Sequence, residues 1–194
     1  MFERDGLAAA CITVIPTTDL AAVAALWGAD LTSPVPDPYD PPPFGDAHSW
    51  HVWFDVRADR IVVVEDNGYR GNEAEVIAAA SRLAEGGRVA SAFWNVNAMA
   101  CCTCAEAGSV LIGPEEVRYG DQAPPEAAEL DDFLAPFRSL PDADELDDSS
   151  DLDTGPSWIG TALAMVERWT STPLMLDLLD VKGRTAYLLE DRLV

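Results

Sequence analysis

Residues 61–64 read Ile-Val-Val-Val, and this run constrains the fold more than any other feature of the sequence. β-Branched side chains favour extended backbone, and successive side chains of a strand point to opposite faces of its sheet. The run is therefore apolar on both faces, which predicts a strand at the centre of a sheet. Residues 50–57 alternate apolar and polar side chains, which predicts a strand with one strongly apolar face, joined to the first by a turn at Ala58-Asp59.

The same reading of periodicity and of turn residues predicts the other elements. Strands are expected at residues 7–15, 88–96, 98–105 (continuing or pairing with the strand before it), 109–112 and 185–189. Helices are expected at residues 18–27, 73–85 and 157–169, and residues 174–181 fit either a helix or a strand. Asn72, with Glu75 three residues on, suggests a capping box for the second helix.

Six prolines fall between residues 33 and 45, which excludes a helix or a central strand there and predicts an extended loop. The elements together predict an α+β fold. We expect a largely antiparallel sheet of about five or six strands, with helices 18–27 and 73–85 on one face. Three parts are expected: an α+β core over residues 1–113, an acidic and partly flexible segment over residues 114–153, and a C-terminal helical segment over residues 154–194 that packs on the core.

The charge of the chain restricts its partners. Among 194 residues, 12 are basic and 34 acidic, a formal net charge of −22. Such a charge argues against binding to nucleic-acid phosphates and against docking on an anionic membrane. The first 16 residues lack the basic flank and the length of a signal peptide or membrane anchor, so a cytoplasmic location is expected.

The segment over residues 114–153 carries 14 of the acidic residues against two arginines. It could attract a basic partner, or it could be a solvated linker. The candidate residues for a docking surface are four acids in this run: Asp144, Glu145, Asp147 and Asp148. The spacing of these acids does not match a calcium-binding EF-hand loop.

Two segments carry distinctive polar residues. Residues 65–71 read Glu-Asp-Asn-Gly-Tyr-Arg-Gly directly after a strand, and residues 91–98 read Ser-Ala-Phe-Trp-Asn-Val-Asn-Ala. Together these two motifs resemble a family of bacterial proteins, common in actinomycetes, known as a domain of unknown function. The resemblance covers roughly residues 7–112 and is weaker after the acidic segment. It implies a similar fold and no particular activity.

The polar residues of these two segments are candidates for a ligand pocket. The first segment is a strand-to-helix turn whose glycines permit unusual backbone angles, and the helix after it points free N–H groups toward the turn. The alternative is a purely structural turn, with the amides of the second segment fixing strand register. Because buried amides need partners, we expect the two segments to lie close together, with candidate residues Glu65, Asn67, Tyr69, Arg70, Trp94, Asn95 and Asn97.

The sulfur and imidazole groups suggest other chemistry. Cys11 stands alone, whereas Cys101, Cys102 and Cys104 lie within four residues, which is no framework for disulfides. In a strand Cys102 and Cys104 share a face and could bind a soft metal with Cys11 or a histidine, but free cysteine is also a common core residue. We expect reduced thiols without a metal or cofactor. His48 and His51 would point to opposite faces of a strand, which disfavours a shared metal.

The sequence contains no convergent set of nucleophile, base and orienting residue. The main functional expectation is therefore a non-catalytic binding or interaction protein with an acidic surface. One analogy is an immunity protein that neutralises a basic toxin, and it rests only on charge and fold class. The alternative is a small-ligand-binding protein or enzyme that uses the pocket between the Asn67 turn and the Trp94–Asn97 strand end. The oligomeric state is not indicated.

Overall fold

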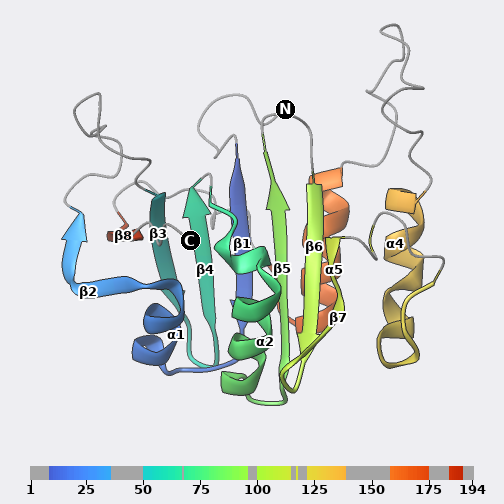
Figure 1. Ribbon diagram of the computed structural model, residues 1–194, viewed down its shortest axis with the longest axis horizontal. Helices are drawn as coiled ribbons and strands as arrows, with labels where there is room; N and C mark the ends of the chain where they lie inside the picture. The colour runs from blue at the N-terminus through green and yellow to red at the C-terminus, as the bar shows by residue number, and fades with distance from the viewer. Residues whose placement is uncertain are drawn as a thin grey trace, which may run out of the picture.

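The computed structural model describes residues 9–35, 50–66, 68–95, 100–114, 117, 122–138, 158–174 and 184–189. These residues form one antiparallel sheet with helices on both of its faces (Figure 1). In chain order the elements are β1 (Ala10–Ile15), α1 (Leu20–Trp27), β2 (Ala29–Val35), β3 (Trp50–Val56), β4 (Ile61–Asp66), the 3-10 helix η1 (Arg70–Asn72), α2 (Ala74–Leu83), β5 (Arg88–Trp94), β6 (Ala100–Glu106), β7 (Ser109–Ile112), the 3-10 helix η2 (Pro125–Leu130), α4 (Asp131–Arg138), α5 (Trp158–Thr170) and β8 (Ala186–Leu189).

The sheet has eight strands in the order β2-β8-β3-β4-β1-β5-β6-β7, and every pairing in it is antiparallel. The α+β class and the antiparallel sheet are thus confirmed, but the expected five or six strands are too few. Strand β2 contains Pro34, the first of the six prolines between residues 33 and 45, and no pattern in its residues indicated a strand. It forms the edge of the sheet with an irregular register before Pro34, and an edge strand tolerates proline because one of its sides needs no partner.

Strand β4 takes the central position expected for Ile-Val-Val-Val. It pairs with β3 on one side and β1 on the other, and Ile61 to Glu65 are all buried. A strand can be apolar on both faces only if both faces are covered, and here helices pack on each face (Figure 1).

Helices α1 and α2 lie on the same face, as expected (Figure 1). The Asp19 carboxylate caps α1 by accepting the Ala22 N–H (3.0 Å), and Gly28 ends it at φ 69°. The predicted cap of α2 is wrong. The helix begins at Ala74, and its N-cap residue Glu73 makes no side-chain capping bond. The Asn72 amide instead contacts β6, because its position in η1 turns it toward the sheet.

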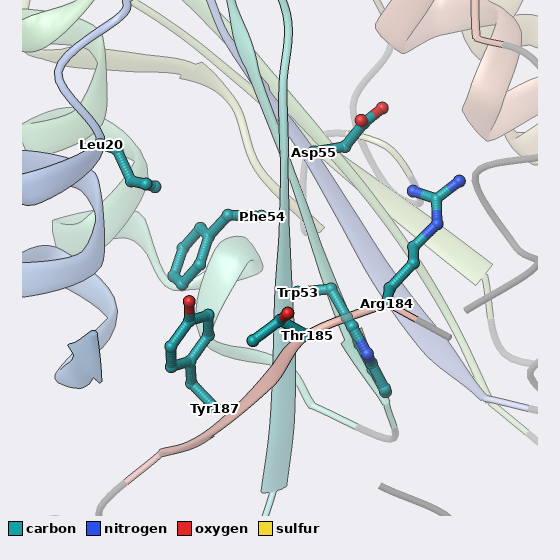
Figure 2. Close-up of a pocket in the computed structure, with 7 residues that line it drawn as sticks. All are labelled: Leu20, Trp53, Phe54, Asp55, Arg184, Thr185 and Tyr187. Atoms are coloured by element: carbon teal, nitrogen blue, oxygen red, sulfur yellow. The ribbon is translucent and has the colours of Figure 1, made fainter. Parts of the chain in front are cut away.

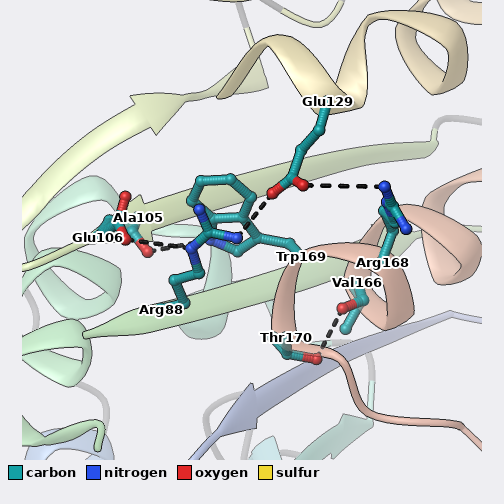
Figure 3. Close-up of polar contacts among 8 residues, drawn as sticks. All are labelled: Arg88, Ala105, Glu106, Glu129, Val166, Arg168, Trp169 and Thr170. Carbon is teal, nitrogen blue, oxygen red and sulfur yellow. Dashed lines mark hydrogen bonds and ion pairs between the residues drawn. The ribbon is translucent and has the colours of Figure 1, made fainter. Parts of the chain in front are cut away.

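Helix α5 covers the opposite face and packs on β5 and β6. Its Trp169 indole N–H donates to the Ala105 carbonyl oxygen (3.2 Å), and the Arg88 guanidinium lies 4.1 Å from the centroid of the Trp169 ring. Arg88 also pairs with Glu106 (3.1 Å) and with Glu129 of η2 (2.7 Å), which ties η2 and α5 to the same end of the sheet (Figure 3).

In the part of the chain that the structure describes, no helix has the length and apolar character needed to cross a lipid bilayer. Residues 141–153, which carry much of the expected acidic linker, and most of residues 174–181 lie outside the described residues.

Candidate functional site

A buried polar cluster lies between the sheet and the α1/α2 layer. Strand register places Cys11 between Glu65 and Phe93, with Cys101 beyond Phe93. The next row on the same face holds Thr13, Ser91 and Thr103. Six side chains of these rows and of η1 are polar or thiol groups that are nearly inaccessible to solvent: Cys11, Thr13, Glu65, Asn72, Ser91 and Thr103.

Glu65 is the acidic residue at the centre of this cluster. Its side chain is fully buried, and three N–H groups donate to its carboxylate: the Trp27 indole (3.0 Å), the Arg70 backbone (3.0 Å) and the Gly71 backbone (2.6 Å). The side chain at the end of β4 thus closes the turn that follows it and holds α1 against that turn. Hydrogen bonds from N–H groups to a buried carboxylate are stronger than those between neutral groups.

Burial raises the pKa of Glu65 above its ordinary value, and the three N–H donors limit that rise because they favour the ionised form. Burial and the neighbouring Glu65 carboxylate raise the pKa of the Cys11 thiol well above its usual range. Burial likewise raises the pKa of Cys101 to about 12. Since the thiolate is the nucleophile and the oxidisable form, these cysteines are poorly suited to thiol catalysis.

The remaining polar groups satisfy one another. The Asn72 side-chain amide donates to Cys101 Sγ (2.9 Å) and accepts from the Thr103 hydroxyl (2.5 Å). The Ser91 hydroxyl lies 3.1 Å from Cys11 Sγ and accepts from the Thr13 hydroxyl (3.3 Å). A network whose members all have partners fixes one arrangement of the strands and of η1.

The turn that follows β4 packs tightly over the cluster. A Cβ on Gly71 would lie 2.1 Å from Thr13 Oγ1 and 2.8 Å from a Glu65 carboxylate oxygen, so only glycine fits there. Tyr69 packs edge-on against Phe93, with ring centroids 4.9 Å apart, and Arg70 donates to the Trp27 carbonyl oxygen. The arrangement therefore stabilises the turn against the sheet, and both carboxylate oxygens of Glu65 already accept hydrogen bonds.

The structure brings together only some of the predicted pocket residues. Glu65, Tyr69 and Arg70 lie around the turn, whereas the Trp94 side chain packs into the core on the opposite face, under α5. Asn95 follows β5, while Asn67 and Asn97 lie outside the described residues. The four acids of the predicted docking surface, Asp144, Glu145, Asp147 and Asp148, also lie outside them.

Cysteine placement matches the alternation expected of a strand. Cys101 faces the α2 layer, whereas Cys102 and Cys104 face α5. All four cysteines are free and buried.

His51 lies on the α5 side beside Trp53 and is paired in register with Asp66, whereas His48 lies outside the described residues. Burial lowers the pKa of His51.

A cavity of about 360 Å³ lies where β8 stops pairing with β3. Seven residues line it: Leu20, Trp53, Phe54, Asp55, Arg184, Thr185 and Tyr187. Figure 2 shows Phe54, Tyr187 and Leu20 on one side of β3 and Trp53, Asp55 and Arg184 on the other. Trp53 is 2% exposed, yet its indole N–H has no hydrogen-bond acceptor among the described residues.

Sequence reasoning missed this cavity because it depends on the pairing of β8 with β3, which brings residues 184–187 beside residues 53–55. No local pattern in either segment carries that information. Comparison with protein-family models, with curated proteins and with solved structures finds no match for the chain.

Proposed function

We propose that this chain is a non-catalytic interaction protein whose acidic surface docks a basic protein, with an immunity-type partnership as one form of it. The observation that carries the proposal is the way the chain uses its few cations. Within the described residues six arginines contact oxygen atoms of the protein itself: Arg57, Arg60, Arg70, Arg82, Arg88 and Arg168.

These internal contacts leave a large excess of negative charge for other molecules, given the net charge of −22. A surface with one dominant sign attracts partners of the opposite sign and raises their association rate. The buried cluster around Glu65 supports a non-catalytic role, because its oxygen and nitrogen atoms are engaged with each other and its thiols are held protonated.

The test compares two sets of four charge-removing substitutions. The first set changes Asp144, Asp147 and Asp148 to Asn and Glu145 to Gln. The second set, the control, changes Glu73, Glu75 and Glu85 to Gln and Asp59 to Asn, four exposed acids outside residues 114–153. A partner is captured from lysate with the wild-type chain and purified, and its association rate is measured by stopped flow at about 0.01 M and about 0.15 M salt.

We expect association to slow steeply with salt, because the Debye length falls from about 30 Å to about 8 Å over this range. The first variant should associate more slowly with little change in dissociation, and the control should be affected less. Salt-independent association, together with wild-type binding by the first variant, would contradict the proposal.

Binding of a small ligand in the cavity beside β3 is a second candidate function. The observation that favours it is the buried Trp53 N–H, which has no acceptor among the described residues. A buried donor left without an acceptor costs about 1–3 kcal/mol. A ligand that fits would present a hydrogen-bond acceptor to this group. Native mass spectrometry of protein purified without denaturation tests this candidate, which predicts a bound small molecule that the Trp53→Phe variant loses. Identical spectra for the two proteins, without added mass, would argue against it.

A further inference from the structure

Three sulfur-containing side chains lie on the α5 face of the sheet, away from the Glu65 cluster. Cys102 Sγ lies 3.4 Å from Met165 Sδ, and Cys104, two residues further along β6, points to the same face. All three side chains are 0% exposed and belong to the apolar core between the sheet and α5.

The fold explains why these atoms converge. Cys102 and Cys104 are two residues apart on β6, so their side chains point to the same face. Helix α5 packs across β5 and β6 and brings Met165 onto that face. Cys11, which the sequence suggested as a companion ligand, lies on the other side of the sheet.

We propose that Cys102, Cys104 and Met165 form a binding site for a soft monovalent metal ion, with Cu(I) as the ion that fits best. Thiolate and thioether sulfur atoms select Cu(I) among the common first-row ions. Zinc is disfavoured because structural zinc sites use four ligands, drawn from Cys, His, Asp and Glu. In the part of the chain that the structure describes, no group of three or more such residues could hold a metal ion.

The spacing between the Cys102 and Met165 sulfur atoms needs only a small adjustment for coordination. If the metal–sulfur bonds are about 2.3 Å long, as in zinc thiolates, two sulfur atoms 3.4 Å apart subtend an angle of about 95° at the ion. Opening this angle to a trigonal value of about 120° separates the sulfur atoms to about 4.0 Å. That change of about 0.6 Å lies within reach of methionine, which has three rotatable bonds.

Binding of Cu(I) to the two thiols releases their protons. One Cu(I) ion bonds to two thiolates and one thioether, and the two thiol protons leave to solvent, so no electron is transferred. Affinity for the ion should therefore rise with pH.

The experiment titrates the purified, reduced chain with Cu(I) alone, under anaerobic conditions and in competition with a chromophoric Cu(I) chelator. The expected result is one Cu(I) per chain, about two protons released per ion, and a near-ultraviolet charge-transfer band. X-ray absorption should show a coordination shell of sulfur only. The variants Cys102→Ala and Cys104→Ala should each lower the affinity at least about 100-fold. The matched controls Cys11→Ala and Cys101→Ala remove thiols on the other face and should leave the affinity within about threefold of wild type.

Met165→Leu keeps the core volume and both thiols, so it tests the site even if a cysteine variant fails to fold. It should reduce the sulfur coordination number from three to two and lower the affinity about tenfold. The proposal is overturned if no Cu(I) binds, if the Cys11 or Cys101 variant loses binding instead, or if Met165→Leu leaves the coordination shell and the affinity unchanged.

Discussion

The buried polar groups on the two faces of the central sheet differ in their hydrogen-bond partners. On the α1/α2 face, Glu65, Asn72 and the hydroxyls of the neighbouring strands bond to one another and to backbone N–H groups. On the α5 face the interior is mostly apolar, but it includes the Trp53 N–H, which has no acceptor among the described residues, and the contact between Cys102 Sγ and Met165 Sδ.

One face of the sheet thus holds a network of buried polar groups bonded to one another, whereas the other face holds polar and sulfur groups outside any such network. Removing a member of a satisfied network leaves its partners buried without bonds, which is costly. Removing a group that has no hydrogen-bond partner leaves no other buried group without a bond. Substitutions on the first face should therefore destabilise the fold more than equivalent substitutions on the second.

The largest effect is expected at Glu65. The Glu65→Ala variant leaves the Trp27 indole and two backbone N–H groups buried without an acceptor, so the free energy of unfolding should fall by about 4 kcal/mol. Urea denaturation followed by circular dichroism measures this loss. Glu85→Ala, at an exposed position, is the control and should change stability by less than about 0.5 kcal/mol. Equal effects of the two substitutions would mean that the network contributes little.

The Gly71→Ala variant should cost about 3 kcal/mol, because the added Cβ would overlap Thr13 Oγ1 and crowd Cys11 Sγ. Gly86→Ala is the matched control. Gly86 has φ +82° but nothing within 4 Å of its would-be Cβ, so its loss of about 1 kcal/mol reports backbone conformation alone. Differential scanning calorimetry of both variants separates the two causes, and a Gly71 variant as stable as the Gly86 variant would rule out steric closure of the turn.

Two buried tryptophans allow the same substitution on each face. Trp27 donates its indole N–H to Glu65 (3.0 Å), whereas Trp53 has no acceptor among the described residues. Each Trp→Phe variant loses a similar volume, so the difference between them isolates the hydrogen bond. Trp27→Phe should cost about 2 kcal/mol more than Trp53→Phe in urea denaturation. A larger loss for the Trp53 variant would reverse the comparison of the faces.

The smallest effect concerns pH, because it changes one proton and removes no contact. Burial holds the pKa of Glu65 above its ordinary value in the folded protein. The stability that this group contributes is thus fully present below its unfolded pKa of about 4.3 and is lost as pH rises through the raised folded pKa. The stability advantage of wild type over Glu65→Gln should shrink from pH 4 to pH 7. An advantage that grows with pH would show that the N–H donors outweigh burial.

Local pattern predicted much of the fold. The central position of β4, the strands on either side of it, and helices α1 and α2 on one face follow from periodicity and from turn residues. The edge strand β2 could not be predicted in this way, because Pro34, at the start of a proline-rich run, argues against a strand unless its edge position is known. The prediction of an Asn72 cap was wrong for a related reason. A buried side-chain amide hydrogen-bonds to the partner that tertiary packing places beside it, here Thr103.

For the candidate sites, the sequence determined which residues carry chemistry and which of them share a strand face. It indicated the Glu65–Gly71 turn, and it placed Cys102 and Cys104 on one face and Cys101 on the other. Only the tertiary structure decided the partners: Trp27 for Glu65, Met165 for Cys102, and β8 for the open end of β3. The physical reason is distance along the chain. Periodicity describes near neighbours in the sequence, whereas these contacts join residues 38 and 63 positions apart and, between β3 and β8, pair Trp53 with Ala186.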